Sequence, residues 1–365
     1  MDTSEIATGP SHASAGSKRA ISERAQEHAL PFRGGVLDIP SLAGKRILIT
    51  GGLGFIGSNL AHACVAQGAK VTLFTNQLKT IANVREIQDQ VEILQGDITN
   101  YHDLTAPVQD KDIIFHLAGQ TSGITSMENP WLDIKANLTG TMNLLENCRV
   151  HNDAARMVTA GSITQAGNVR QLPITGDERD NPLSVYEVNK MVCEKYAMIY
   201  HRAYGFPATC LRLSTLYGER QQLTSPRFGI TNYFIGRIFR NEPIIVYDQG
   251  EFRRDYLYIG DVIHALLLAA SKNTAGRVFP IGTNQATRFI HMVQEVIAAA
   301  QEVAGIAGSY QFAEFPAEHK KVDVGDSQVD YRKFHDATGW EPKTMLPEGI
   351  RSTMAFYRER RQEYL

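Results

Sequence analysis

The chain has 365 residues, of which 43% are hydrophobic and 21% charged, an ordinary composition for a soluble globular protein. Its 37 basic and 39 acidic residues give a net charge of −2, which argues against nucleic acid as a partner. The longest apolar stretch, residues 262–270, contains His264 and is shorter than the roughly 20 residues that a membrane-spanning helix needs. We therefore expect neither a nucleic-acid nor a membrane partner.

The cysteines are spread widely and lack the CxxC spacing of metal sites. They are Cys64, Cys148, Cys193 and Cys210. We expect small buried thiols and no metal. Residues 1–43 are rich in Ser, Ala, Gly and charge, which predicts a mobile N-terminal extension with a helix near residues 22–29. The N-terminus also lacks the apolar core of a secretory signal, so we predict a cytoplasmic protein.

From Lys45 onward, short β-branched apolar runs alternate with helical stretches. The predicted strands are residues 46–50, 69–74, 91–94, 112–116 and 156–160, and the predicted helices include 59–67, 130–149 and 186–204. This alternation predicts the α/β class, with a doubly wound parallel sheet and right-handed crossovers. The last 140 or so residues lack the alternation. We interpret much of them as a smaller lobe that covers the substrate.

A glycine-rich turn, TGGLGFIG at residues 50–57, follows the first strand and opens a helix. In that position Gly51 allows a tight turn, Gly54 allows a pyrophosphate to approach, and Gly57 allows close helix–strand packing. The amide groups at the helix start, at Phe55 and Ile56, favour a phosphate. The turn therefore predicts a dinucleotide cofactor.

The second strand ends without the acidic residue that usually binds the adenosine ribose of NAD. Thr75 and Asn76 stand there instead, with Lys79 close by. Both can bond ribose hydroxyls, and neither would repel a 2′-phosphate. We predict NAD and do not exclude NADP. After the third strand, Asp97 and the adjacent Ile98 are candidates for the adenine site, although Asp97 could equally cap a helix.

A tyrosine and a lysine, Tyr186 and Lys190, are spaced to share one face of a helix, one turn apart. A free tyrosine is a poor base at neutral pH, and a neighbouring ammonium group stabilises its phenolate. Ser162 follows the fifth strand and could bond the same substrate hydroxyl. We predict these residues as the catalytic group.

With these features, the chain resembles the extended short-chain dehydrogenase/reductases, specifically their nucleotide-sugar epimerases and dehydratases. The motifs that carry the resemblance are TGGLGFIG at 50–57, HLAG at 116–119, Asn137 with Gly140-Thr141, YEVNK at 186–190, LRLSTLYG at 211–218, RDY at 254–256 with Asp261, and GWEP at 339–342. The resemblance implies a Rossmann domain at 44–218. It further implies that 219–365 is mainly a nucleotide-sugar-binding lobe, with some segments returning to the Rossmann domain.

The resemblance also assigns roles to residues. Leu117, Ala118 and Asn137 would join Tyr186 and Lys190 in binding the cofactor. Tyr186 would take a proton from a sugar hydroxyl while a hydride passes to NAD that stays bound. Arg254 would grip the diphosphate of the sugar nucleotide. Family members commonly form homodimers through the helices that carry Asn137 and Tyr186, so a homodimer is expected.

The residues after Ser162 favour one reaction of the family over the others. Dehydratases and decarboxylases carry acids just after the catalytic Ser/Thr, whereas this chain has Ile163-Thr164-Gln165. We therefore predict an epimerase, acting at C4 of the sugar through a keto intermediate, with Ser162, Thr164, Thr215 and Arg254 binding the substrate. Thr215 replaces the usual Asn of its motif. A dehydratase or decarboxylase, an NAD(P)-dependent sugar reductase or dehydrogenase, and a silent dinucleotide-binding scaffold remain as alternatives.

Overall fold

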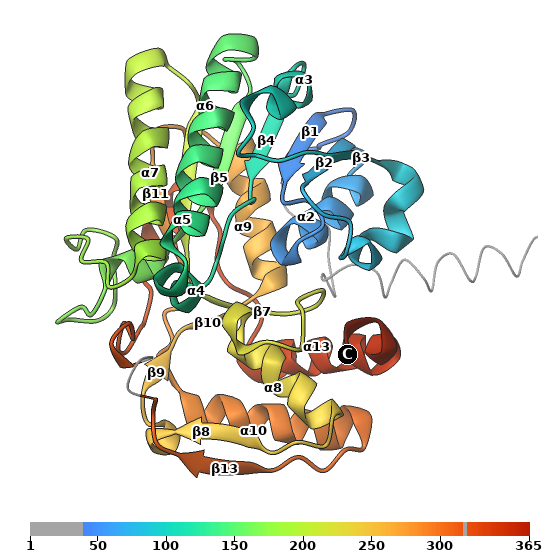
Figure 1. Cartoon of the computed structure of the whole chain (residues 1–365), viewed down its shortest axis with the longest axis vertical. Coiled ribbons are helices and arrows are strands. Elements are labelled where there is room, and N and C mark those ends of the chain that lie inside the picture. Colours follow the sequence, from blue (N-terminus) through green and yellow to red (C-terminus); the bar gives the residue numbers. More distant parts are fainter. Residues whose placement is uncertain (1–38, 317–319) are drawn as a thin grey trace, which may run out of the picture.

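The structure, a computed structural model, describes residues 39–316 and 320–365. The predicted helix at 22–29 and almost all of the predicted extension lie outside these residues. The described chain has a large parallel sheet covered by helices, with a smaller lobe beside it that contains α8, α10 and α13 (Figure 1). The limits proposed for the two domains remain a prediction.

The central sheet has seven strands in the order β11-β6-β5-β4-β1-β2-β3. Its strands are β1 (Arg46–Thr50), β2 (Lys70–Thr75), β3 (Val91–Gln95), β4 (Ile113–His116), β5 (Arg156–Ser162), β6 (Ala208–Leu213) and β11 (Val278–Ile281). All neighbouring strands are parallel. The predicted fold class, a Rossmann-type doubly wound sheet, is confirmed. Sequence reasoning located five of these strands within a few residues and assigned no strand to β6 or β11.

Helices cover both faces of the sheet. They are α2 (Phe55–Ala66), α3 (Thr105–Val108), α4 (Gly123–Glu128), α5 (Pro130–Asp133), α6 (Gly140–His151), α7 (Val185–Tyr204) and α9 (Ile259–Ser271). Strand β1 shows the two-sided burial: Ile47 and Ile49 lie in the core with α2 and α9, whereas Leu48 lies in the core with α6 and α7. Alternate residues of a strand point to opposite faces of the sheet, and here both faces are buried.

Two predicted helices have different limits in the structure. The helix predicted at 59–67 begins at Phe55, because the glycine turn leads into it directly through Gly54. The stretch predicted at 130–149 is α5, a π-helical segment η3 (Ile134–Thr139) and α6 in succession. By contrast, α7 begins within a residue of its predicted start, because Ser184 and Glu187 form a reciprocal capping box.

The smaller lobe contains short strands and helices that pack on one another. They are β7 (Thr215–Tyr217), α8 (Ile230–Phe239), β8 (Ile244–Tyr247), β9 (Arg253–Arg254), β10 (Tyr256–Tyr258), β12 (Thr287–Arg288), α10 (Phe289–Ala299), the π-helical η7 (Ala300–Ala304), β13 (Tyr310–Ala313) and α13 (Leu346–Tyr364). The helix α12 (Arg332–Thr338) packs instead on β11 of the central sheet, where Phe334 contacts Phe279. The remaining short 3₁₀ segments are η1 (Ile81–Gln90), η2 (Tyr101–Leu104), η4 (Ile163–Ala166), η5 (Pro226–Phe228) and η6 (Asp248–Gly250). Among the described helices, none is both long and apolar enough to cross a membrane.

The strand order reverses at β1, which lies between β4 and β2. Open parallel sheets bind ligands at such a reversal, beyond the carboxyl ends of the strands. Thr50 and His116 are paired at this edge, and His116 is also paired with Thr159 of β5. The predicted site residues follow these same strand ends.

Candidate active site

The glycine turn connects β1 to α2 at the reversal point. Gly51 has a φ of 68°, and a Cβ there would lie 2.9 Å from the Ala118 nitrogen. A Cβ on Gly57 would lie 2.3 Å from the Gly51 carbonyl oxygen. No side chain caps α2 at Gly54. The first amides of an α-helix have no partner within the helix, so those at Phe55 and Ile56 suit a pyrophosphate.

The strand ends on the other side of β1 hold the residues predicted for the adenosine half. Thr75 is buried, and its hydroxyl donates to the Gln77 carbonyl at 2.9 Å. Asn76 is exposed. Asp97 is exposed and accepts from the Thr99 amide at 2.9 Å, so it closes the turn after β3, whereas Ile98 is buried in the core. The second strand ends without a carboxylate, as the sequence indicated.

His116 ends β4 as a packed residue. Its ring nitrogens lie 3.0 Å from the Thr50 hydroxyl and 2.9 Å from the Thr141 hydroxyl. Burial, with the charge of Lys190 as a smaller cause, lowers its pKa to about 3, so the imidazole is neutral. The Thr50 hydroxyl also accepts from the Leu117 and Ala118 amides, both at 3.2 Å. This network fixes the HLAG segment against β1, where the resemblance places the cofactor.

Asn137 lies in the π-helical segment η3 and is almost fully buried. Its amide donates to the Gln120 carbonyl at 3.1 Å and to the Asp133 carboxylate at 2.9 Å. The same carboxylate accepts from Asn189 of α7 at 2.6 Å. The π-turn thus directs Asn137 toward the segment after β4, and Asp133 joins that segment to the helix that carries Tyr186. Sequence reasoning did not single out Asp133.

The predicted catalytic residues approach from β5 and α7. The Ser162 hydroxyl lies 2.8 Å from the Thr164 hydroxyl. Tyr186 is fixed at the start of α7, where its amide donates to the Ser126 hydroxyl at 3.0 Å. Lys190 follows one turn later, close enough to His116 and Cys193 to affect their pKa values. Within the described residues, the Tyr186 hydroxyl and the Lys190 ammonium make no hydrogen bond or ion pair.

Glu187, next to Tyr186, is a carboxyl group that sequence reasoning overlooked. It is 4% exposed and accepts from the backbone amides of Leu183 and Ser184. The Thr164 side chain is another of its hydrogen-bond partners. Burial raises its pKa to about 7, against these bonds, which lower it. The S-x-x-E pattern at 184–187 is the signal that could have revealed it.

The structure brings together Thr215 and Arg254, two of the four residues predicted to bind the substrate. Thr215 of β7 is paired with Tyr256 of β10, and its amide donates to the Asp255 carbonyl at 3.1 Å. Arg254 immediately precedes Asp255 in the chain. Its guanidinium binds the Asp323 carboxylate with two bonds, of 3.0 and 2.8 Å, and donates to the Gly325 carbonyl at 2.6 Å. Asp323, distant in sequence, was not predicted.

A buried ion pair supports the Ser162 turn from below. Glu194 of α7 binds Arg212 of β6 through bonds of 2.7 and 2.8 Å, and both residues are at most 4% exposed. Gln165 donates to Glu194 at 3.3 Å and to Asp180 at 3.2 Å.

Beside the turn after Ser162 lies a cavity of about 910 Å³, formed mainly by the segment 166–181. Across the described residues, no cluster of His, Cys, Asp or Glu could hold a metal ion.

Comparison with known proteins adds to this geometry. The sequence model of the NAD dependent epimerase/dehydratase family matches residues 47–282. A UDP-glucose 4-epimerase from Mycolicibacterium smegmatis is 28% identical over 325 residues, which cover 87% of this chain and 100% of that protein. A dTDP-D-glucose 4,6-dehydratase from Mus musculus is 25% identical over 328 residues, 88% of this chain and 90% of that protein.

Solved structures agree with the sequence relatives. The UDP-glucose 4-epimerase of Thermotoga maritima, determined with UDP-glucose, is 28% identical. It matches with a TM-score of 0.78 over 86% of this chain and 99% of that one. The family model spans the glycine turn and the Tyr186–Lys190 pair, and the fold is similar to that of the matched epimerase structure. The chain belongs to the NAD-dependent epimerase/dehydratase family.

Proposed function

We propose that this protein is a nucleotide-sugar 4-epimerase that uses NAD. The observation that carries the proposal is the composition of the turn after Ser162. The 3₁₀ segment η4 contains Ile, Thr, Gln and Ala, and so brings no carboxylate beside the Ser162 hydroxyl. The Glu187 carboxyl group, which has Thr164 as a partner, is engaged by the backbone amides of Leu183 and Ser184 at the start of α7. Elimination of water needs a positioned acid and base, whereas epimerisation needs only reversible oxidation and rotation of the keto sugar.

The residues of the chain have distinct tasks in this reaction. The Tyr186 hydroxyl takes the proton of the sugar hydroxyl and returns it, and the Lys190 ammonium favours the phenolate form that this requires. The Ser162 hydroxyl, oriented by Thr164, bonds the same sugar oxygen. The glycine turn and the HLAG segment hold the dinucleotide. When bound, its nicotinamide ring supplies the acceptor and donor of a hydride.

The proposal is tested with purified protein, without added cofactor, incubated with a panel of UDP-, dTDP-, GDP- and CDP-sugars. Products are separated by chromatography and weighed by mass spectrometry. We expect a new product peak of unchanged mass from the sugars of one of these nucleotides, and no such peak from the Tyr186→Phe variant. A product lighter by water or by carbon dioxide would overturn the epimerase assignment.

A second candidate function is an NADP-dependent sugar reductase. The end of β2 favours it, because the buried Thr75 and the exposed Asn76 place no negative charge where a 2′-phosphate would lie. The two functions differ in cofactor use. Tight binding of NADPH, with turnover only when it is supplied, would favour the reductase. NAD that remains with the purified protein would favour the epimerase.

We further propose that the protein forms a homodimer through the outer sides of α5, α6 and α7. Large apolar residues are exposed there: Trp131 at 70%, Leu132 at 48%, Val150 at 53%, Val188 at 40% and Tyr204 at 57%. Such residues are typical of a protein–protein interface. Sedimentation should give a dimer for the wild type and a monomer for a Trp131→Glu, Leu132→Glu variant. A wild-type monomer at micromolar concentration would contradict the proposal.

A further inference from the structure

The glycine turn is supported from behind by two buried asparagines, Asn59 of α2 and Asn83 of η1. The Asn59 amide donates to the Phe55 carbonyl at 2.8 Å and to the Glu219 carbonyl at 2.9 Å. The Asn83 amide donates to the Leu53 carbonyl at 3.0 Å and to the Arg220 carbonyl at 3.2 Å. Each asparagine therefore joins one carbonyl of the turn to one carbonyl of the segment after β7.

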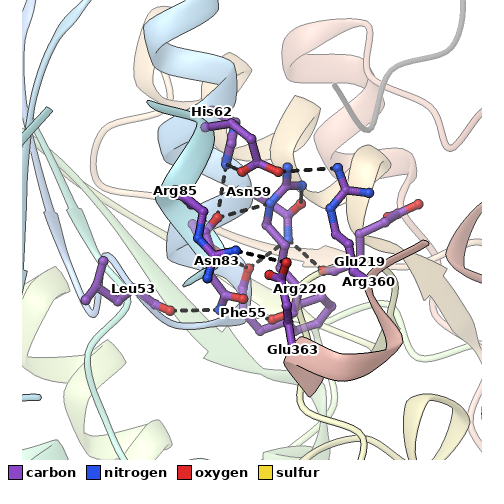
Figure 2. Close-up of polar contacts among 12 residues, drawn as sticks. Leu53, Phe55, Asn59, His62, Asn83, Arg85, Glu219, Arg220, Arg360 and Glu363 are labelled. Atoms are coloured by element: carbon purple, nitrogen blue, oxygen red, sulfur yellow. Dashed lines mark hydrogen bonds and ion pairs between the residues drawn. The ribbon is translucent and has the colours of Figure 1, made fainter. Parts of the chain in front are cut away.

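Arg220 returns these contacts with its guanidinium. It donates to the Asn59 side-chain oxygen at 3.0 Å and to the Asn83 carbonyl at 3.2 Å. Figure 2 shows Arg220 lying between the two asparagines, with His62 above them. Arg220 is 3% exposed and has a φ of 66°, which residues other than glycine rarely adopt. The hydrogen bonds of the Arg220 guanidinium therefore help to hold the backbone at Arg220 in this conformation.

The last turn of α13 completes the cluster. The Tyr364 hydroxyl donates to the Asn83 side-chain oxygen at 2.6 Å. This bond fixes which end of the Asn83 amide faces the glycine turn. Two ion pairs join α13 to η1: Arg85 with Glu363 at 2.9 Å (Figure 2), and Arg360 with Glu86 at 3.3 Å.

The segment 218–221 is also fixed to the smaller lobe. Asn232 of α8 bonds both the amide and the carbonyl of Gly218, at 3.1 and 2.7 Å. Tyr357 of α13 donates to the Gln221 carbonyl at 2.6 Å. The segment continues directly from β7, which carries Thr215. One short stretch of chain thus connects the proposed substrate side to the back of the glycine turn.

From these contacts we propose that Asn83, oriented by Tyr364, is a positioning residue for the dinucleotide, and that it couples the smaller lobe to the glycine turn. Its amide holds the Leu53 carbonyl, and so keeps the turn in the shape that presents its amides to a pyrophosphate. Burial lowers the pKa of His62 to about 4 and leaves it neutral, and the charged groups around the pair are Arg220, Glu86, Arg360 and Glu363. The proposal requires only the dinucleotide site of the family, whichever sugar is converted.

The test compares Tyr364→Phe and Asn83→Ala with a matched control, Tyr233→Phe. Tyr233 lies on α8 of the smaller lobe, and Tyr233→Phe removes the 3.0 Å hydrogen bond that its hydroxyl accepts from Arg237. No hydrogen bond shown for that hydroxyl reaches the glycine turn. The dissociation constant for NAD is measured by calorimetry after stripping the cofactor, together with the NAD retained per chain after gel filtration. We expect the constant to rise about 5- to 50-fold in both test variants and to stay within about twofold in the control.

A double variant distinguishes positioning through Asn83 from a general loosening. If Tyr364 acts through Asn83, Tyr364→Phe has no further effect on NAD binding in the Asn83→Ala background. Unchanged NAD affinity in both single variants, with only a lower melting temperature, would overturn the proposal. Additive losses in the double variant would overturn the orienting role of Tyr364. Should Asn83→Ala fail to fold, Tyr364→Phe, which removes one oxygen atom, decides the question alone.

Discussion

The two sides of the candidate site are built in different ways. On the sheet side, Thr50, His116 and Ser162 lie at the ends of adjacent parallel strands, and hydrogen bonds between neighbouring strands and turns fix them. On the substrate side, Arg254 lies on a strand of two residues and is held by Asp323, far along the chain. The proposed chemistry thus depends on groups fixed at a regular sheet, whereas the proposed recognition of the sugar nucleotide depends on loops that long-range contacts bring together. Loops of this kind can change without disturbing the catalytic group.

The largest effect should come from removing the Tyr186 hydroxyl, the group proposed to move the proton. Tyr186→Phe keeps the ring but removes the proton that the hydroxyl moves, so we expect kcat to fall about 10²- to 10⁴-fold. The same change at Tyr196, also on α7, should leave kcat within about twofold. Circular dichroism of both variants checks the fold. Comparable losses in the two would mean that the helix, not the Tyr186 hydroxyl, is what activity needs.

A second variant measures how firmly the sheet side is held. Glu194→Ala leaves the buried Arg212 with Asp180 as its remaining acidic partner, and we expect the free energy of unfolding to fall by about 3 kcal/mol. Glu302→Ala removes a partner of Arg351 from an exposed pair of the smaller lobe, and less than about 1 kcal/mol should be lost. Urea unfolding at fixed NAD concentration measures both. Equal losses would contradict the contrast.

The substrate side is tested at Arg254. Arg254→Lys keeps the charge but loses the two-pronged guanidinium, so KM for the nucleotide sugar should rise about tenfold while kcat changes little. Arg253→Lys, at the exposed neighbour, is the control. Initial rates across substrate concentrations separate the two constants. A fall in kcat with unchanged KM would place Arg254 among the groups that act on the transition state.

The smallest expected effect concerns Glu187 and pH. Because burial raises the pKa of its carboxyl from 4.5 to about 7, its contribution to stability is complete below about pH 4.5 and is lost as the pH rises through 7. Glu187→Gln can still cap α7 but cannot ionise. Relative to this variant, the wild type should lose about 2 °C in melting temperature between pH 6 and pH 8. Parallel curves would show that Glu187 does not titrate in this range.

Sequence reasoning worked where function and local structure use the same residues. The glycine turn, the strand ends and the start of α7 each depend on a short stretch of chain, so the spacing of Gly51 to Gly57 and of Tyr186 to Lys190 was sufficient to place these elements. The functional roles assigned to these residues, and to Thr75 and Asn137, remain predictions. The Thr75 hydroxyl donates to Gln77, and the Asn137 amide donates to Gln120 and Asp133, so both side chains already have partners within the protein.

Contacts between distant segments were beyond reach of the sequence. Tyr364 and Asn83 are 281 positions apart, and Arg254 and Asp323 are 69 apart. No periodicity or motif links such pairs, because the fold of the whole chain decides which loops meet. The strand β11 escaped prediction for a related reason: it enters the sheet at its edge after a long excursion through the smaller lobe.

The four cysteines give the protein a set of internal reporters. All four are free and buried, and burial raises the pKa of each thiol. They lie on α2, α6, α7 and β6, so each tracks a different helix or strand of the sheet domain. A thiol reagent can react with any of them only when the structure around that element opens. The order in which the four become labelled would therefore reveal the order in which the molecule comes apart, without any engineered probe.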